Sequence, residues 1–213
     1  MTSHSKINQA ATIIKNFGIV CYPTETIYGL GVLFDSEEAL HKLYALKKRD
    51  SQKPISLLVS SVEMLENITE EISDTAQMLI NEFWPGPLTL VFKISSKIPE
   101  NIRMLLTADT NTIGVRISSC TIAQELVQTV GKPITTTSAN ISGEESSTDL
   151  EYIKKKLEID YYLPAENEFL MLPSTVLDVT KTTPKIIREG AITRQSLKNY
   201  LKSILKSSFL DSL

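Results

Sequence analysis

Apolar residues recur along this chain at two alternating spacings. Between residues 7 and 17 they fall every three or four positions, which predicts an amphipathic helix that ends at Gly18. The unbroken apolar run of residues 19–22 then predicts a buried strand, which Pro23 ends. The pattern as a whole predicts helices over residues 7–17, 35–46, 72–83, 122–130, 148–157 and 193–205, and apolar runs or strands over residues 19–22, 27–34, 55–59, 88–94, 112–117, 133–137, 175–179 and 185–188.

This alternation of helices and strands predicts an α/β (α+β) fold around a mostly buried, mixed sheet. The 213 residues are 42% hydrophobic and 22% charged, so the chain can bury a sizeable core, and its length favours one domain. Capping signals support two of the helix starts: Asp35-Ser36-Glu37-Glu38 resembles a capping box, and Glu151 completes a cap for the helix from Thr148. Residues 142–149 and 163–174 are expected to form surface or active-site loops.

Charge and composition exclude several classes of protein. A formal net charge of −3 argues against a broad nucleic-acid-binding face, although it leaves room for a local basic pocket. No apolar run approaches the roughly 20 residues that span a bilayer, and residues 1–17 lack a signal-peptide pattern, so we expect a cytoplasmic protein without membrane contact. Cys21 and Cys120 are far apart in the sequence and belong to no CxxC motif, which predicts neither a disulfide framework nor a bound metal.

A polar loop follows the predicted strand of residues 133–137. Its sequence, residues 138–143, contains small hydroxyl, amide and glycine residues, which can bring backbone N–H groups close to an anion. Such a loop often binds no ligand, so an anion-binding function needs support from cationic residues elsewhere in the sequence. Lys47, Arg49 and Lys53 follow a predicted helix, where they act either as a solvated helix end or as a phosphate clamp.

Arg116 is less ordinary, because it ends a predicted strand whose other residues are apolar. A buried guanidinium needs an anionic partner, which is either a carboxylate of the protein or a ligand. Ser174 and Arg188 also lie at strand ends, where open α/β sheets commonly bind ligands. Thr24 and Thr26 lie in the turn after Pro23, and their hydroxyls either stabilise the turn or face a cleft.

These polar segments, taken in order, resemble the YrdC/TsaC family of threonylcarbamoyl-AMP synthases. Each piece is weak alone, whereas the ordered set is specific and covers residues 7–193. The segments that carry the resemblance are Tyr22-Pro23-Thr24-Glu25-Thr26-Ile27-Tyr28-Gly29-Leu30-Gly31, Lys47-Lys48-Arg49, Phe83-Trp84-Pro85-Gly86-Pro87-Leu88-Thr89, Gly114-Val115-Arg116, Thr137-Ser138-Ala139-Asn140-Ile141-Ser142-Gly143, Ser174-Thr175-Val176 and Arg188-Glu189-Gly190-Ala191-Ile192-Thr193.

The resemblance implies an open, twisted, mixed β-sheet flanked by helices, with a deep concave cleft, in a YrdC-like domain over residues 1–193 followed by a helical tail over 194–213. It also implies synthesis of threonylcarbamoyl-AMP and pyrophosphate from L-threonine, bicarbonate and ATP. The product would pass to the threonylcarbamoyl transferase machinery that makes the t6A37 modification of tRNA. Mg²⁺ is expected to arrive with ATP, since the sequence shows no dedicated carboxylate cage for it.

The family's functional residues carry over to matching positions of this sequence. The KxR and SxN elements, which line the nucleotide end of the family's cleft, imply catalytic roles for Lys47, Arg49, Ser138 and Asn140. The resemblance further implies ATP binding by Arg49, Lys53, Thr112, Ser138, Ser146 and Arg188, and threonine binding by Thr26, Arg116, Thr136 and Ser174.

Two positions depart from the family pattern. Lys53 stands where many relatives have asparagine, and Leu58 stands where the longer, two-domain relatives often have a substrate-contacting histidine. Short relatives carry an aliphatic residue at the position of Leu58. This departure therefore weakens the assignment of one substrate contact and not the resemblance to the family. About twenty residues follow the final motif in this sequence, so we expect the short, single-domain form of the family.

Two other functions stay open. An RNA-binding or ribosome-associated module could use the same concave face, with a weak tRNA or RNA contact, but the net negative charge and the missing aromatic stacking motif disfavour it. A paralogue resembling YciO would share the fold and catalyse a different reaction. The intact KxR and SAN elements weigh against that alternative.

Overall fold

The computed structural model describes residues 3–48 and 53–204. Eight helices lie in these ranges: α1 (Ser3–Lys15), α2 (Glu37–Lys47), α3 (Val62–Glu66), α4 (Asp74–Phe83), α5 (Glu100–Thr107), α6 (Thr121–Val130), α7 (Leu150–Lys156) and α8 (Arg194–Ile204). The same ranges contain ten strands: β1 (Val20–Pro23), β2 (Tyr28–Gly31), β3 (Leu57–Leu58), β4 (Leu88–Lys93), β5 (Thr112–Arg116), β6 (Ile134–Thr135), β7 (Thr137–Ser138), β8 (Tyr161–Tyr162), β9 (Thr175–Asp178) and β10 (Lys185–Arg188).

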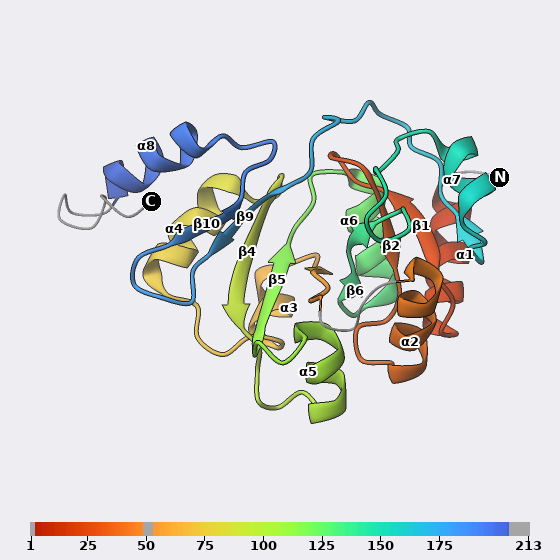
Figure 1. Ribbon diagram of the computed structural model, residues 1–213, viewed down its shortest axis with the longest axis horizontal. Helices are drawn as coiled ribbons and strands as arrows, with labels where there is room; N and C mark the ends of the chain where they lie inside the picture. Colours follow the sequence, from red (N-terminus) through yellow and green to blue (C-terminus); the bar gives the residue numbers. More distant parts are fainter. Residues whose placement is uncertain (1–2, 49–52, 205–213) are drawn as a thin grey trace.

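The strands form two mixed sheets, flanked by helices (Figure 1). One sheet has the order β7-β2-β1-β8, and the other has the order β10-β9-β4-β5-β3-β6. Each contains parallel and antiparallel pairs: β1 pairs parallel with β8 and antiparallel with β2, and β4 pairs parallel with β9 and antiparallel with β5. The expected α/β class is confirmed, with the strands divided between two sheets.

The chain passes from one sheet to the other within five residues. β6 is an edge strand of the larger sheet, and β7 is an edge strand of the smaller one. Thr136 is the single residue that connects these two strands. Hydrogen bonds hold this crossing on both sides: Thr136 N donates to Ser56 O at 2.7 Å, and the buried Tyr22 hydroxyl donates to Thr135 O at 2.9 Å. Burial raises the pKa of Tyr22, so this hydroxyl stays protonated as a donor.

Local sequence signals explain where several helices begin and end. The Ser36 side chain accepts a hydrogen bond from Ala39 N and caps α2, as the capping pattern predicts, and Gly131 ends α6 in a left-handed conformation with φ of +77°. At α7 the predicted cap is wrong. Asp149, rather than Thr148, caps this helix, because its carboxylate reaches the N–H groups of Glu151 and the following residue.

Two apolar clusters fill the space between the sheets and their helices. One packs α1 and α6 against β1, and Leu58 lies in it, completely buried. The larger cluster extends as far as α8, whose Leu197 and Leu201 are fully buried. The Tyr200 ring meets the Phe83 ring edge-on, with ring centroids 5.2 Å apart, and its hydroxyl donates to a carbonyl of α4. The described part of the expected tail is therefore a helix packed on the core, while a domain boundary at residue 193 stays a prediction.

No described helix is long and apolar enough to span a bilayer.

We expect Leu201→Ala to lower the free energy of unfolding by about 2–4 kcal/mol, because it empties a fully buried position between α8 and the core. Chemical denaturation followed by circular dichroism measures the change. Lys202→Ala, on the exposed side of the same helix, should change the free energy by less than about 0.5 kcal/mol. Equal stability of the two variants would show that α8 does not pack on the core in solution.

Candidate active site

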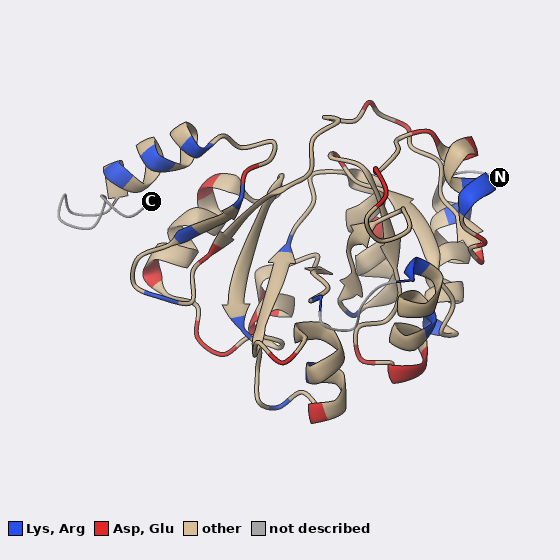
Figure 2. Cartoon of the chain, viewed as in Figure 1, with Lys and Arg blue, Asp and Glu red and all other residues tan. Residues whose placement is uncertain are grey.

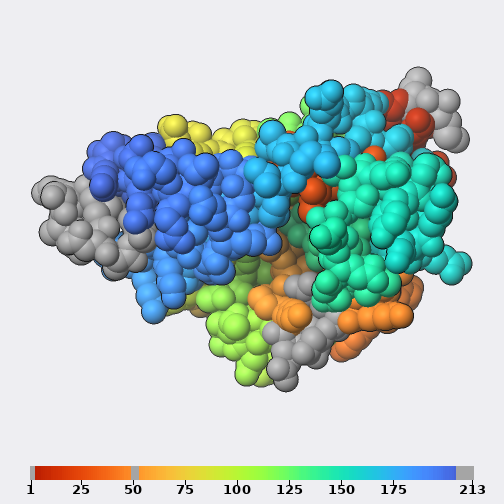
Figure 3. Space-filling view, turned by 45° about the horizontal axis from the view of Figure 1, so that its top comes forward, coloured from red at the N-terminus to blue at the C-terminus, as the bar shows by residue number. Residues whose placement is uncertain are grey.

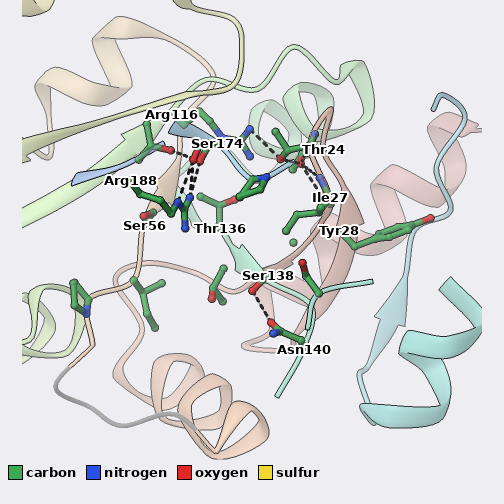
Figure 4. A pocket seen from close by; sticks show the side chains of 18 of the residues that line it. Thr24, Ile27, Tyr28, Ser56, Arg116, Thr136, Ser138, Asn140, Ser174 and Arg188 are labelled. Atoms are coloured by element: carbon green, nitrogen blue, oxygen red, sulfur yellow. Dashed lines mark hydrogen bonds between the residues drawn. The ribbon is translucent and has the colours of Figure 1, made fainter. Parts of the chain in front are cut away.

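A cavity of about 410 Å³ lies where the two sheets diverge. Its surface opening lies in the hollow between the C-terminal segment and the loop and helix around residues 140–157 (Figure 3). Figure 4 shows Arg116, Ser174 and Arg188 on one side of the cavity, and Ser138 and Asn140 on the other. Eight of the residues to which the resemblance assigns a role line it: Thr26, Arg116, Thr136, Ser138, Asn140, Ser146, Ser174 and Arg188.

Arg116 forms a buried ion pair at the end of β5. Its Nη1 donates to Glu25 Oε1 at 2.6 Å, and the two side chains are only 5% and 12% exposed. Of the two partners that the sequence left open, the protein's own carboxylate therefore occupies one edge of the guanidinium. Arg116 Nε is buried and has no hydrogen-bond partner in the described part of the chain, and Nη1 also lies 3.4 Å from Thr26 Oγ1.

Glu25 itself is held from three directions behind the cavity wall. The Ser118 hydroxyl donates to its second carboxylate oxygen, and that hydroxyl accepts a hydrogen bond from Cys120 N at 3.2 Å, which directs its proton toward Glu25. The backbone carbonyl of Glu25 accepts from Leu170 N at 2.9 Å, so the loop between β8 and β9 also rests on this residue. Glu25 has no functional role predicted from the sequence, because only the fold places it beside Arg116.

Arg188 lies against Ser174 on the same side of the cavity. Its Nη2 donates to the Ser174 carbonyl at 2.8 Å, and the Ser174 hydroxyl shares a hydrogen bond of 2.8 Å with Thr89. Partial burial and, to a smaller extent, the positive charge of Arg116 lower the pKa of Arg188. The Arg188 guanidinium stays charged at neutral pH, and no ion pair of Arg188 occurs among the described residues. An anion bound here would offset this repulsion.

The loop of residues 138–146 forms the opposite wall. Ser138 Oγ donates to Asn140 Oδ1 at 2.5 Å, and Asn140 Nδ2 donates to the Glu144 carbonyl at 2.5 Å, so the loop closes on itself. Gly143 has φ of +92°, a conformation that favours glycine. Glu144 and Ser146 extend this wall, and the sequence analysis named only the second of them.

Lys47 does not lie where the phosphate-clamp hypothesis requires. It is fully buried, does not line the cavity, and donates through Nζ to the carbonyls of Ser138 and Asn140 at 2.5 and 2.7 Å. The last turn of α2 packs against the loop of residues 138–146 rather than facing solvent, and this packing turns the ammonium inward. The structure therefore gives Lys47 no surface in the cavity through which to contact a ligand phosphate, and its catalytic role stays a prediction.

Two further predicted ATP-binding residues, Lys53 and Thr112, do not line the cavity. A third, Arg49, lies outside the described residues, so its role stays a prediction. Lys53 is exposed and precedes Pro54, which lines the cavity. Thr112 starts β5, at the opposite end of the strand from Arg116, and its hydroxyl shares a hydrogen bond of 3.0 Å with Thr110.

Other cavity residues were missed by the sequence analysis. Ser56 and Thr89 line the cavity with their hydroxyl groups, and Thr89 lies in a segment that the resemblance includes without assigning it a role. The position of Thr89 one residue into β4 is a weak signal that sequence reasoning alone cannot distinguish from a structural threonine. Among the described residues, no group of three or more His, Cys, Asp or Glu side chains is arranged to hold a metal ion.

The geometry matches a known family. A sequence profile for the Sua5, YciO and YrdC proteins, described as "Telomere recombination", matches residues 12–190. The chain belongs to this Sua5/YciO/YrdC family. A threonylcarbamoyl-AMP synthase of Pyrococcus abyssi is 33% identical over 201 residues, which are 93% of this chain and 58% of that protein.

Solved structures of the family agree with the fold. P. abyssi Sua5 complexed with L-threonine superimposes with a TM-score of 0.87 at 33% identity, over 93% of this chain and 58% of that one. E. coli YciO superimposes with a TM-score of 0.77 at 29% identity, over 88% of this chain and 90% of that one. The chain thus spans a little more than half the length of the Sua5 protein and most of the length of YciO.

We expect Glu25→Ala to lower the free energy of unfolding by about 3–5 kcal/mol, because it leaves the buried charge of Arg116 without its carboxylate. Thermal and urea denaturation measure the loss. The matched control is Glu38→Ala, which breaks an exposed pair with Lys42 and should cost less than about 1 kcal/mol. If both substitutions cost the same, the Glu25–Arg116 pair is not buried in solution.

Proposed function

We propose that this member of the Sua5/YciO/YrdC family makes L-threonylcarbamoyladenylate and pyrophosphate from L-threonine, bicarbonate and ATP. One observation carries the proposal: Ser174, named for threonine, and Arg188, named for ATP, are in direct contact at 2.8 Å within one cavity. The two predicted substrate ends therefore meet at this pair, where the reacting atoms would have to lie together.

The threonine end is built around Arg116. Its guanidinium, oriented by Glu25, offers a charged donor to the substrate carboxylate. The hydroxyl groups of Thr26, Thr136 and Ser174 line the same wall and supply partners for the substrate amine and hydroxyl. The crystal structure of P. abyssi Sua5 with L-threonine supports a threonine site, because that protein is 33% identical over a match that covers 93% of this chain and 58% of that one.

The nucleotide end lies between Arg188 and the loop of residues 138–146. Arg188 supplies a positive charge without an acidic partner among the described residues, and Ser138, Asn140 and Ser146 supply hydroxyl and amide groups. Mg²⁺ enters as part of the ATP substrate. Glu144, the acidic side chain in the described lining, lies on the nucleotide side, where it would face that ion rather than the bare phosphates.

The reaction then requires two bond-forming steps. The threonine amine attacks the carbon of bicarbonate, a C–N bond forms, and water leaves to give a carbamate. A carbamate oxygen attacks the α-phosphorus of ATP, the bond to the β-phosphate oxygen breaks, and pyrophosphate leaves. The protein contributes by holding three anionic groups together and by stabilising the charge that develops on the leaving group, for which Arg188 supplies a cation in the cavity lining.

The proposed product is a reactive mixed anhydride, so an acceptor must consume it soon after release. We propose that the threonylcarbamoyl transferase machinery for tRNA takes it up in the cytoplasm. A broad RNA-binding face has little support, because basic and acidic positions are interspersed over both halves of the molecule (Figure 2). Any contact with tRNA would be weak.

A YciO-like activity is the second candidate. The observation that favours it is coverage: the chain spans 90% of E. coli YciO and 58% of P. abyssi Sua5. The position of Leu58 does not separate the two candidates, because this residue is buried in the core behind the cavity.

Substrate dependence tests the proposed reaction. We expect pyrophosphate to form from Mg·ATP only when L-threonine and bicarbonate are both present, because the carbamate must exist before it attacks phosphorus. A coupled pyrophosphate assay and mass spectrometry of the adenylate measure the reaction. Binding of ATP without pyrophosphate release under all substrate combinations would favour the YciO-like alternative.

Valine tests the assignment of the threonine end. It replaces the substrate hydroxyl by a methyl group of similar size, so the hydroxyls of Thr26 and Ser174 would lose a buried partner. We expect kcat/KM for valine to be lower than for threonine by about 100-fold or more. Serine, which keeps the hydroxyl, is the control and should react better than valine. Comparable rates for valine and threonine would contradict this placement of the substrate.

A further inference from the structure

The ammonium of Lys47 is enclosed by the loop that forms the nucleotide side of the cavity. Its Nζ lies 2.5 Å from Ser138 O, 2.7 Å from Asn140 O and 3.3 Å from Asn140 Oδ1, and the residue has no exposed surface. Burying an ammonium is unfavourable unless acceptors replace its water. Three oxygens of one short loop do so here, which ties the conformation of that loop to the charge of Lys47.

The contact also runs in the opposite direction. Ser142 N donates to the backbone carbonyl of Lys47 at 2.8 Å, so the end of α2 both gives hydrogen bonds to the loop and accepts one from it. This bond satisfies a carbonyl of the last helical turn, which has no partner within its own helix. Helix and loop are thus joined at three successive points, Ser138, Asn140 and Ser142.

These bonds determine what the loop offers to a ligand. The carbonyl oxygens of Ser138 and Asn140 turn toward the ammonium, which keeps the negative ends of two peptide dipoles off the cavity. Asn140 Oδ1 accepts from both Lys47 and Ser138 Oγ, so the amide orientation is fixed and its Nδ2 side is directed to the Glu144 carbonyl and the cavity. Lys47 thus lies behind the loop, and its hydrogen bonds fix which groups the loop presents to an anion in the cavity.

We propose that Lys47 is a positioning residue, which holds the loop of residues 138–144 in its anion-binding conformation without touching the nucleotide. This inference rests on the proposed function for the identity of the ligand, an adenine nucleotide. The conformational part, in which Lys47 orders the loop, applies with no ligand bound. A lysine that bound phosphate directly would leave the empty loop unaffected when it is replaced.

Hydrogen exchange of the ligand-free protein separates these roles. In Lys47→Met we expect the amides of residues 138–144 to exchange about tenfold faster or more than in the wild type, while those of β4 and β5 stay protected. Lys42→Met, on the exposed side of the same helix, is the matched control and should leave exchange in the loop unchanged. Unchanged exchange of residues 138–144 in Lys47→Met would overturn the proposal.

Binding measurements give the second readout. With a non-hydrolysable ATP analogue and Mg²⁺, we expect the Kd of Lys47→Met to rise about tenfold or more, while the Kd for L-threonine changes less than about threefold. Lys47→Arg, which keeps the charge and several donors, should recover part of the loop protection and of the nucleotide affinity. An equal loss of affinity for both ligands would contradict a role confined to the loop.

Folding of the variants is checked by circular dichroism. If Lys47→Met does not fold, Lys47→Arg carries the test, and failure of both to fold overturns the proposal, because Lys47 would then support the whole fold. Failure of the proposed function has a different signature: the wild-type protein would release no pyrophosphate, while exchange in the loop would still depend on Lys47.

Discussion

The crossing of the chain between its two sheets at residues 134–138 is the constraint on which the rest of the structure depends. β6 and β7 are separated by a single residue, yet they pair with strands of different sheets. The hydroxyl of Thr135 both donates to Leu30 O and accepts from Val32 N, so a side chain completes the hydrogen bonding that a regular strand would supply. The sheets diverge from this point, and the cavity occupies the space between them.

Charge in the cavity is organised in two layers. Arg116 and Arg188 are on the wall, while Glu25 and Lys47 lie behind it and contact the residues that a ligand would meet. Both hidden groups are held by several hydrogen bonds, so neither needs to move when an anion enters. Such fixed dipoles and charges stabilise a ligand without the reorganisation that water would require.

Periodicity in the sequence predicts most of the long elements, because their apolar faces are continuous and their ends carry Gly, Pro or capping residues. It does not reveal α3, which is five residues long, or β8, which is a two-residue strand held mainly by its partner β1. The pattern also fails to predict α5, because this helix follows Pro99 and has no side-chain cap at its start. The division into two sheets is decided by pairing between distant segments, which no local pattern records.

Candidate site residues divide in a similar way. The family resemblance predicts eight of the residues that line the cavity, whereas residue type and position at strand ends single out Arg116, Ser174 and Arg188. Burial reverses the interpretation of Lys47, since a lysine at a helix end is solvated by default and only the packing of α2 against a distant loop excludes water from it. Glu25 is missed for the same reason, as its partner is 91 positions away in the chain.

Because of the ion pair between Glu25 and Arg116, the electrostatic potential in the cavity depends on a residue that does not form part of its wall. Glu25 does not line the cavity, yet it neutralises one of the two arginines that do. A change of charge at position 25 would therefore alter the net potential that a ligand meets while every atom it touches stays the same. Selectivity for anionic against zwitterionic ligands can in this way diverge between related proteins whose cavity walls are identical.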